Sequence, residues 1–320
     1  MACWNAQGLL AADASRQQTR IKRAAKLILN RDMLVLTETH GNEGKCRARR
    51  LPHGVRAFWC DGLEGEAGVG IWVKESFIEQ VIGKKGGHDW VKVVPGRAAV
   101  LRLWGPDGCL QIGMVYLQTG NSGGREARSK TLRSLAQELD KGGKTLTVLI
   151  GDLNFVTDKR DRVNGDPLQH TGGRDKGEAE DLHDLLGRLG LAELEQAEFT
   201  YRFEDCRSRI DRMYTNMGRY EWMDRDIGCV ALDWDDITSR HRPIAGFKRS
   251  RAEELNSRPI QLDEVGGEEW SRRIQIEFLQ RLRDGDGWAS GVERMLLVKE
   301  AVWKVTRQIA KEKTMAPLSC

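Results

Sequence analysis

The stretch Ile150-Gly151-Asp152-Leu153-Asn154-Phe155 follows an apolar run that begins at Leu146. The run from Leu146 to Ile150 predicts a buried strand, which places Asp152 and Asn154 just beyond its end. These residues are two positions apart, so on an extended backbone their side chains point to the same side. Taken alone the motif is usually a turn, because Asp and Asn side chains cap backbone groups there. It becomes informative when other strand ends carry similar residues.

Other predicted strands also carry such residues, at or near their ends. Asn5 lies near the end of a short strand expected over 2–7, and Glu38 lies at the end of the apolar strand over 33–39. Asp211 follows Arg209-Ile210, and Ser239-Arg240-His241 open the last expected strand. A single carboxylate after a strand is ordinary, so only the ordered set of these motifs is informative.

Hydrophobic periodicity over residues 1–248 predicts an α/β (α+β) fold of two packed mixed sheets with helices outside. Helices are expected over 15–29, 125–140 and 178–189. The polar segment 155–177 is long for a connection in a packed domain, which favours a functional role for it. Further strand-forming segments, rich in Val, Ile, Leu and aromatic residues, cover 68–77, 90–104, 109–118, 199–203, 208–214 and 241–247.

Composition limits the classes of function. The chain has 320 residues, 51 basic and 47 acidic side chains and a net charge of +4, so bulk charge does not drive binding to polyanions, although a local basic face remains open. We expect no membrane partner, because no stretch approaches the ~20 apolar residues of a membrane helix. Seven scattered cysteines without metal-site spacing predict reduced thiols and an intracellular protein.

The sequence changes character after Lys248. Residues 249–267 are charged and contain glycine, as linkers do, and residues 292–311 place apolar side chains at helical spacing. The chain is therefore expected to consist of one domain over 1–248 and a charged linker with a helical extension over 249–320.

Taken in order, the motifs WNAQGL (4–9), LTETH (36–40), GDLN (151–154), RID (209–211) and SRHRPI (239–244) resemble the endonuclease/exonuclease/phosphatase superfamily. The resemblance covers about residues 1–248 and is strongest to the apurinic-like endonucleases of retrotransposons without long terminal repeats. It implies a four-layer α/β/β/α sandwich and a DNA endonuclease in which a metal-activated water attacks the phosphate. It also implies Mg²⁺, with Mn²⁺ as the alternative, a DNA partner and hence a nuclear location. Residues 249–320 would then be a spacer toward a reverse transcriptase.

The chemistry of phosphodiester cleavage assigns roles to four of these residues. A hard cation takes oxygen ligands, and Glu38 is the obvious carboxylate for it. Asn5 either ligates the metal directly or holds Glu38 and a metal-bound water. Asp152 can accept a proton from the attacking water while the Asn154 amide orients the water or the phosphate. Turn capping is the competing explanation for Asn5 and Asn154.

The remaining roles come from the resemblance. It makes Asp211 the carboxylate that orients His241, whose imidazole contacts the phosphate as base or as electrostatic stabiliser. Tyr116 matches a strand-end tyrosine of the family that contacts the scissile phosphate, and an ordinary sheet tyrosine is the alternative. Thr200 and Ser239 match hydroxyls that touch phosphate or support the site.

Basic side chains offer two candidate DNA contacts. The loop over 158–163, with Arg162, lies directly after GDLN, which favours contact with the DNA backbone. For the cations of the helix expected over 125–140, a solvated face is the favoured explanation; they are Arg125, Arg128, Lys130 and Arg133.

Two departures from the family pattern bear on activity. Arg240 stands where the family has Asp, and a cation there predicts weakened metal binding or slow turnover through like-charge repulsion. Alternatively, strand alternation turns Arg240 away from Ser239 and His241, toward a DNA phosphate. Only three residues precede Trp4, fewer than in the family, so we expect a truncated chain or a fragment.

Two other functions compete with the endonuclease. One is another phosphoesterase of the same fold, such as an abasic-site endonuclease, an exonuclease or a phosphatase, although small-molecule substrates are not expected. The other is a decayed copy that binds DNA without cutting it, which Arg240 and the short start favour. The SRHRPI and FTYRF motifs and the helical spacer favour the retroelement endonuclease.

Overall fold

The computed structural model divides the chain into two compact units, Met1–Arg249 and Ser250–Cys320. The predicted boundary at Lys248 lies one residue before this division. In the second unit residues 272–277, 280, 301, 304 and 305 are helical, and the rest of the predicted helical extension lies outside the described residues. In the first unit the structure describes residues 1–10, 13–41, 51–62, 66–120, 122–139, 142, 144–165, 169–170, 176–194, 196–218, 227–235 and 238–248.

One six-stranded sheet contains the N-terminal strand, in the order β15-β16-β1-β2-β4-β3. Strands β1 and β2 are parallel, and the other neighbours in this sheet are antiparallel. Helix α1 (Ala14–Leu29) begins after Asp13, whose side chain accepts hydrogen bonds from two backbone N–H groups of its first turn. The strands are β1 (Ala2–Asn5), β2 (Met33–Thr37), β3 (Val55–Cys60), β4 (Val69–Lys74), β15 (Ile227–Ala231) and β16 (Ile244–Lys248).

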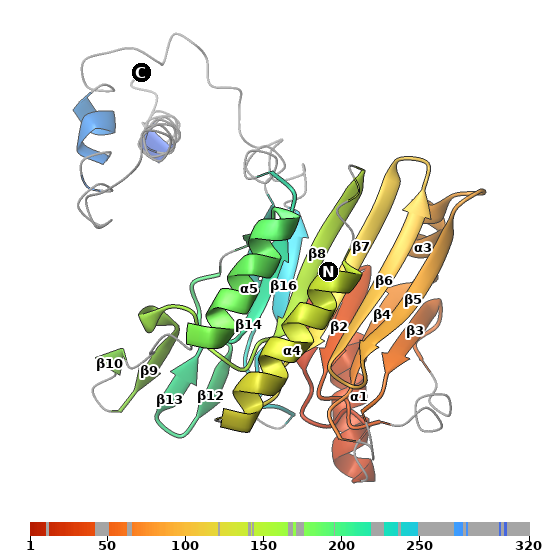
Figure 1. Ribbon diagram of the computed structural model, residues 1–320, viewed down its shortest axis with the longest axis horizontal. Coiled ribbons are helices and arrows are strands. Elements are labelled where there is room, and N and C mark those ends of the chain that lie inside the picture. Colours follow the sequence, from red (N-terminus) through yellow and green to blue (C-terminus); the bar gives the residue numbers. More distant parts are fainter. Residues whose placement is uncertain are drawn as a thin grey trace, which may run out of the picture. The chain divides into compact units, whose positions relative to one another are not determined.

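The second six-stranded sheet has the order β11-β14-β8-β7-β6-β5. Strands β7 and β8 are parallel, and β14 returns antiparallel to β8. Helices α4 (Ser122–Glu138) and α5 (Lys176–Leu189) lie side by side on one face of this sheet (Figure 1). The strands are β5 (Gly87–Val94), β6 (Ala98–Gly105), β7 (Gly108–Tyr116), β8 (Thr145–Asp152), β11 (Ala192–Glu193) and β14 (Asp211–Thr215).

Three apolar layers hold these elements together. Between the sheets, Val35 and Ile71 pack in one cluster with Met114 and Ile150. On the outside, α1 packs on the first sheet around Trp4, and α4 and α5 pack on the second. Burial of these faces is the main driving force for such layering. The predicted α/β/β/α sandwich of two packed mixed sheets is confirmed.

A small four-stranded sheet, in the order β10-β9-β13-β12, lies beside the sandwich. It contains part of the segment 155–177, which the sequence predicted only as a long polar loop. That segment forms a 3-10 turn, η2 (Lys159–Asp161), and two short strands, β9 (Arg162–Asn164) and β10 (Gln169–His170). The hairpin of β12 (Tyr201–Phe203) and β13 (Cys206–Ser208) completes the sheet.

The structure differs from the predicted elements in several places. The segment expected over 90–104 contains a turn and divides between β5 and β6. Residues 75–77 were expected to extend a strand but begin helix α3 (Glu75–Ile82). The strand expected over 208–214 is interrupted, because β13 ends at Ser208 and β14 begins at Asp211 in a different sheet. Strands β3, β11 and β15 were not predicted, and all three are edge strands. Among the described helices, none has the length and apolar character to cross a membrane.

Candidate active site

Strand ends from both sheets meet at one place. Asn5 ends β1 and pairs in register with Thr37, the residue before Glu38. In the second sheet Asp152 lies between Tyr116 and Asp211 on the neighbouring strands. The two groups are joined across the sandwich, because Asn5 Nδ2 donates a buried hydrogen bond of 2.8 Å to Asp152 Oδ2.

His241 completes a buried cluster with two carboxylates. Its Nδ1 lies 2.9 Å from Asp211 Oδ2, and its Nε2 lies 3.9 Å from Asp152 Oδ2. All three residues are at most 4% exposed. Burial opposes the charged imidazole, but the charges of Asp211 and Asp152 raise the pKa of His241 to about 9. His241 is therefore cationic at neutral pH and fixed in orientation.

Asp152 is the member of this cluster best placed to exchange a proton. Burial, and next the charge of Asp211, raise the pKa of the Asp152 carboxyl well above its ordinary value. The charge of His241 and the hydrogen bond from Asn5 act in the opposite direction. A carboxylate poised in this way can accept a proton near neutral pH.

Glu38 supplies a third carboxylate at the same end of the sandwich. It has a positive φ of 55°, and its Oε1 lies 3.4 Å from His40 Nε2. Partial burial opposes ionisation, but hydrogen bonds from His40 and Asn5 lower the pKa of Glu38. Glu38 is therefore a charged carboxylate, and the Asn5 amide contacts both it and Asp152.

The donor set suits a divalent cation. Asp152 and Asp211 each bring a carboxylate oxygen within 4.8 Å of the other and of His241, and Glu38 adds a third, charged carboxylate. The cationic His241 orients these carboxylates and does not ligate. Within the described part of the chain, the buried Asp211 Oδ1 has no hydrogen-bond partner. An unpartnered buried carboxylate oxygen is costly unless a ligand satisfies it, and hard cations prefer carboxylate oxygens.

Asn154 and Tyr116 flank Asp152. The Asn154 backbone N–H donates to Asp152 Oδ1 at 2.9 Å, and its Nδ2 donates to the carbonyl of Leu117 at 2.7 Å. The side chain thus ties the end of β8 to the end of β7. Tyr116 is 7% exposed, and burial raises the pKa of its phenol, which stays neutral.

Arg97 belongs to the site, although the sequence did not single it out. Its Cζ lies 4.8 Å from the centroid of the Tyr116 ring, and its backbone carbonyl accepts a hydrogen bond from Tyr116 N. Its buried Nη1 has no partner among the described residues. A basic residue in a Pro-Gly turn gives no sequence signal for a site, because only the pairing of β6 with β7 brings it to Tyr116.

Thr200 and Ser239 lie behind the cluster and bond the backbone. Thr200 Oγ1 accepts hydrogen bonds from the backbone N–H groups of Ile210 and Asp211, at 3.2 and 3.1 Å. Ser239 Oγ donates to the carbonyl of Asn5 at 2.7 Å and accepts from His241 N at 3.0 Å. Since both side chains are buried, the geometry favours support of the site over contact with phosphate.

Arg240 lies outside the cluster. It is exposed between the buried Ser239 and His241, and its Cζ lies 4.2 Å from the centroid of the Phe203 ring. The alternation expected from an extended backbone is therefore present, and the guanidinium does not point at the buried carboxylates.

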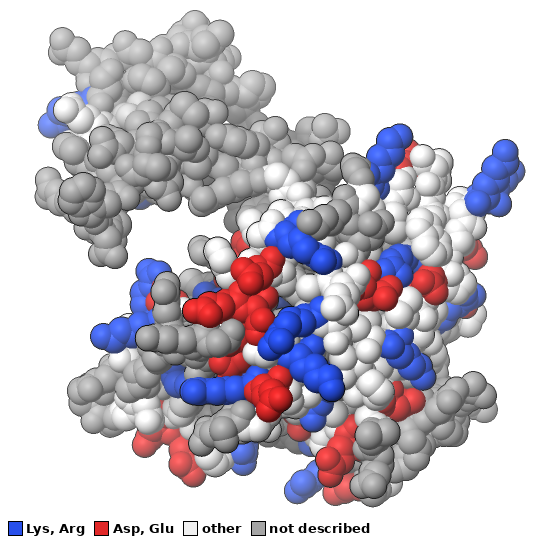
Figure 2. Space-filling view, in the orientation of Figure 1, with Lys and Arg blue, Asp and Glu red and all other residues white. Residues whose placement is uncertain are grey.

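The other candidate cations differ in their partners. Arg162 is half-buried on β9, and its Nε donates to Ser208 Oγ at 3.2 Å. Basic and acidic side chains lie next to one another over α4 and α5 (Figure 2). Three α4 cations pair there with α5 carboxylates. The pairs are Arg125–Glu178, Arg128–Glu178 and Arg133–Asp181.

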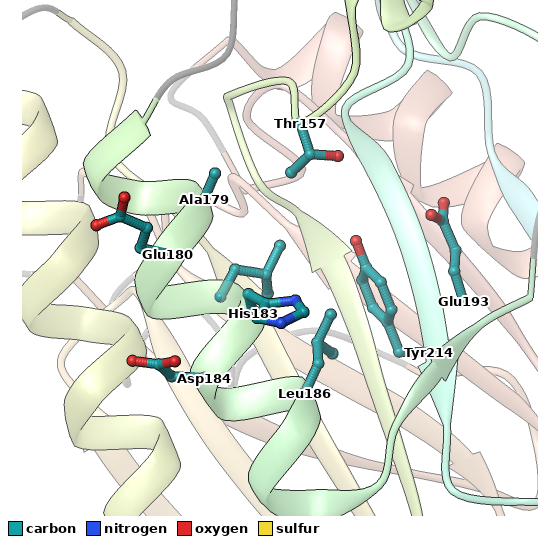
Figure 3. Close-up of a pocket in the computed structure, with 9 residues that line it drawn as sticks. Thr157, Ala179, Glu180, His183, Asp184, Leu186, Glu193 and Tyr214 are labelled. Atoms are coloured by element: carbon teal, nitrogen blue, oxygen red, sulfur yellow. The ribbon is translucent and has the colours of Figure 1, made fainter.

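A pocket of about 680 Å³ lies between α5 and β14 (Figure 3). Its lining includes His183 and Asp184 of α5 and Tyr214 of β14. None of the strand-end residues lines this pocket, so it is separate from the site.

Several solved structures share the fold. The endonuclease domain of TRAS1, a telomere-specific non-LTR retrotransposon, aligns with 78% of this chain and 96% of its own at 16% identity, with a TM-score of 0.50. An AP endonuclease from Archaeoglobus fulgidus aligns with 78% of this chain and 98% of its own at 16% identity and a TM-score of 0.54. A 3′-5′ exonuclease from Neisseria meningitidis aligns with 77% of this chain and 98% of its own at 18% identity and a TM-score of 0.54.

By sequence, no curated protein matches the chain with significance. A family profile does match residues 2–222, a range that contains Asn5, Glu38, Asp152 and Asp211. That profile describes the endonuclease/exonuclease/phosphatase family, whose members are generally metal-dependent phosphoesterases. On this match and the shared fold, the chain belongs to the endonuclease/exonuclease/phosphatase family.

Proposed function

We propose that the chain is a divalent-metal-dependent DNA endonuclease of the kind that nicks a retrotransposon target site. The observation that carries the proposal is the hydrogen bond from Asn5 to Asp152. Because the Asn5 side chain also hydrogen-bonds Glu38, Asn5 joins this carboxylate to the Asp152–Asp211–His241 cluster at one rim of the sandwich. Cleavage of a phosphodiester requires these two functions, charge neutralisation and delivery of a water, to lie side by side.

Glu38 would hold the cation, Mg²⁺ or Mn²⁺, with the Asp211 and Asp152 carboxylates close by. When bound, the ion would neutralise charge on the phosphoryl group and polarise it. Asn5 would act as a positioning residue, because its amide already contacts both Glu38 and Asp152.

Asp152 would take a proton from the attacking water, since the pKa of its carboxyl is raised toward neutrality. His241, kept cationic by Asp211, would stabilise the negative charge that builds up on the phosphoryl oxygens. Asn154 would hold the proton acceptor in place through its bond to Asp152 Oδ1.

Arg97 and Tyr116 would bind the scissile phosphate. The unpartnered Nη1 of Arg97 offers a charge-assisted hydrogen bond to a phosphate oxygen, and the neutral Tyr116 hydroxyl can donate a second one. The solved relatives named above include nucleases, which supports DNA as the substrate. We expect a nuclear location on this ground, and a spacer role for residues 249–320.

The test is nicking of supercoiled plasmid by the full chain with Mg²⁺, with Mn²⁺ and with EDTA. We expect relaxation with either metal, none in EDTA, and a loss of at least about 100-fold in E38A, D152N and H241A, as for removal of groups that act in the transition state. Matched controls are H183A and D184N on α5, which remove the same chemical groups from the separate pocket.

Two outcomes would contradict the proposal. Hydrolysis confined to abasic DNA, to 3′ ends or to small phosphate esters would assign another phosphoesterase activity of the family. Retardation of DNA without any cleavage in Mg²⁺ or Mn²⁺ would favour a binding protein that has lost activity.

A further inference from the structure

The backbone of Arg240 is fixed on both sides. Its N–H donates to Gln7 Oε1 at 2.8 Å, and its carbonyl accepts from Arg202 N at 3.1 Å. Gln7 follows β1 and Arg202 lies on β12, so Arg240 bridges the first sheet and the small sheet. The position of its Cα relative to His241 is therefore set by the fold.

The side chain of Arg240 is also held in place. Its guanidinium lies over the Phe203 ring, 4.2 Å from the centroid, and donates a hydrogen bond to Tyr201. The Tyr201 ring in turn packs on His241, with 4.8 Å between ring centroids. Stacking on aromatic faces suits guanidinium groups and lowers the entropy cost of using their remaining donors.

The charge of Arg240 lacks an acidic partner in the part of the chain that the structure describes. Arg209 and Arg212 pair there with Asp161 and Glu193, and Arg242 pairs with Glu198. Arg240 contacts neutral aromatic groups and is exposed. Among the described residues no carboxylate neutralises this exposed, aromatic-stacked cation, which suits it to bind an anion.

We propose that Arg240 binds a DNA backbone phosphate next to the one at His241, and so acts as a specificity-determining residue for a polymeric substrate. The inference rests on the proposed function in taking DNA as the ligand. It also replaces the expectation that this arginine repels the metal, because its guanidinium is held on Phe203 and Tyr201 and not against the buried carboxylates.

The experiment measures binding of a fluorescent DNA duplex in EDTA by anisotropy, over a series of salt concentrations. Each phosphate contact contributes about 0.9 to the slope of log K against log salt. We expect R240A to weaken DNA binding by about 10-fold at low salt. It should also reduce the magnitude of the slope of log K against log salt by about 0.9, the contribution of one phosphate contact. R240K should keep most of the slope but bind more weakly than the wild type, because lysine cannot form the planar stack.

The matched control is R56A, which removes one exposed arginine from β3, the edge strand at the far end of the first sheet. Its salt slope should equal that of the wild type. The inference is overturned if R240A and R56A have equal slopes, or if R240D binds DNA as well as the wild type and nicks faster with Mg²⁺. Because binding is measured without metal, a slope that depends on Arg240 in a protein that never nicks would uphold this inference and reject only the proposed activity.

Discussion

His241 is buried between two carboxylates. The raised pKa that keeps its imidazole charged at neutral pH is a property of the folded state. The sequence could identify this histidine from the SRHRPI motif, and Asp211 from RID, because each motif is local. It could not give the 2.9 Å contact between them or the burial that makes the contact strong. Arg97 could not be identified in this way, because no motif marks it. Only its contacts with Tyr116, at the end of β7, bring it to the site.

At this scale we predict a pH dependence of stability in the metal-free protein. The pKa of His241 rises from about 6.5 in the unfolded chain to about 9 in the folded one. Its stabilising contribution should therefore be complete below pH about 6.5 and disappear as the pH rises through about 9. Urea unfolding of wild type and H241N in EDTA checks this.

The difference in free energy of unfolding between wild type and H241N should shrink steadily across that range. Both proteins contain the same buried cysteines and tyrosines, so the comparison cancels their ionisation. The remaining difference reports His241 together with Asp152, because the charge of His241 lowers the pKa of the Asp152 carboxyl. A difference that stays constant between pH about 6 and about 9.5 would mean that folding does not raise the pKa of His241.

Helices α4 and α5 illustrate the scale of elements. Their apolar periodicity predicted both helices, but the sequence could not show which cations of α4 face α5. Arg128 is 4% exposed and Glu178 is 1% exposed, and Arg128 also donates to the carbonyls of Gln118 and Gly120. This buried pair therefore fastens the loop after Tyr116 to the helical layer.

We predict that R128M lowers the free energy of unfolding by about 3–5 kcal/mol, because it leaves Glu178 buried without its main partner. The double variant R128M/E178L should lose much less than the sum of the single changes. Denaturant titration of the single and double variants measures this coupling.

The control is R133A, which breaks an exposed pair with Asp181 and should cost less than about 1 kcal/mol. If R128M cost no more than R133A, the Arg128–Glu178 pair would be as weakly coupled as a surface pair.

For the whole molecule, the site depends on the packing of two sheets. Every residue assigned to the site lies in Met1–Arg249, the first compact unit. Asn5 and Asp152 are far apart in the sequence and belong to different sheets. They form a hydrogen bond because the two sheets pack face to face.

We therefore predict that a chain ending at Arg249 unfolds in one cooperative transition and nicks plasmid within about twofold of the full chain, as an independent domain would. Circular dichroism during heating and the plasmid assay check the two parts. Loss of the cooperative transition on truncation would mean that residues after Arg249 belong to the folding unit.

The sequence by itself determined the layered fold and most of the strand-end residues, because apolar periodicity and short motifs are local properties of the chain. The edge strands β3, β11 and β15 were missed because burial does not impose a clear pattern on an edge. Only the tertiary structure decided that Asn5 bonds Asp152, that Thr200 and Ser239 support the backbone, and that Arg240 stacks on Phe203. Each of these contacts joins residues from separate strands or loops, and the distances between them exist only once the sheets have paired and packed.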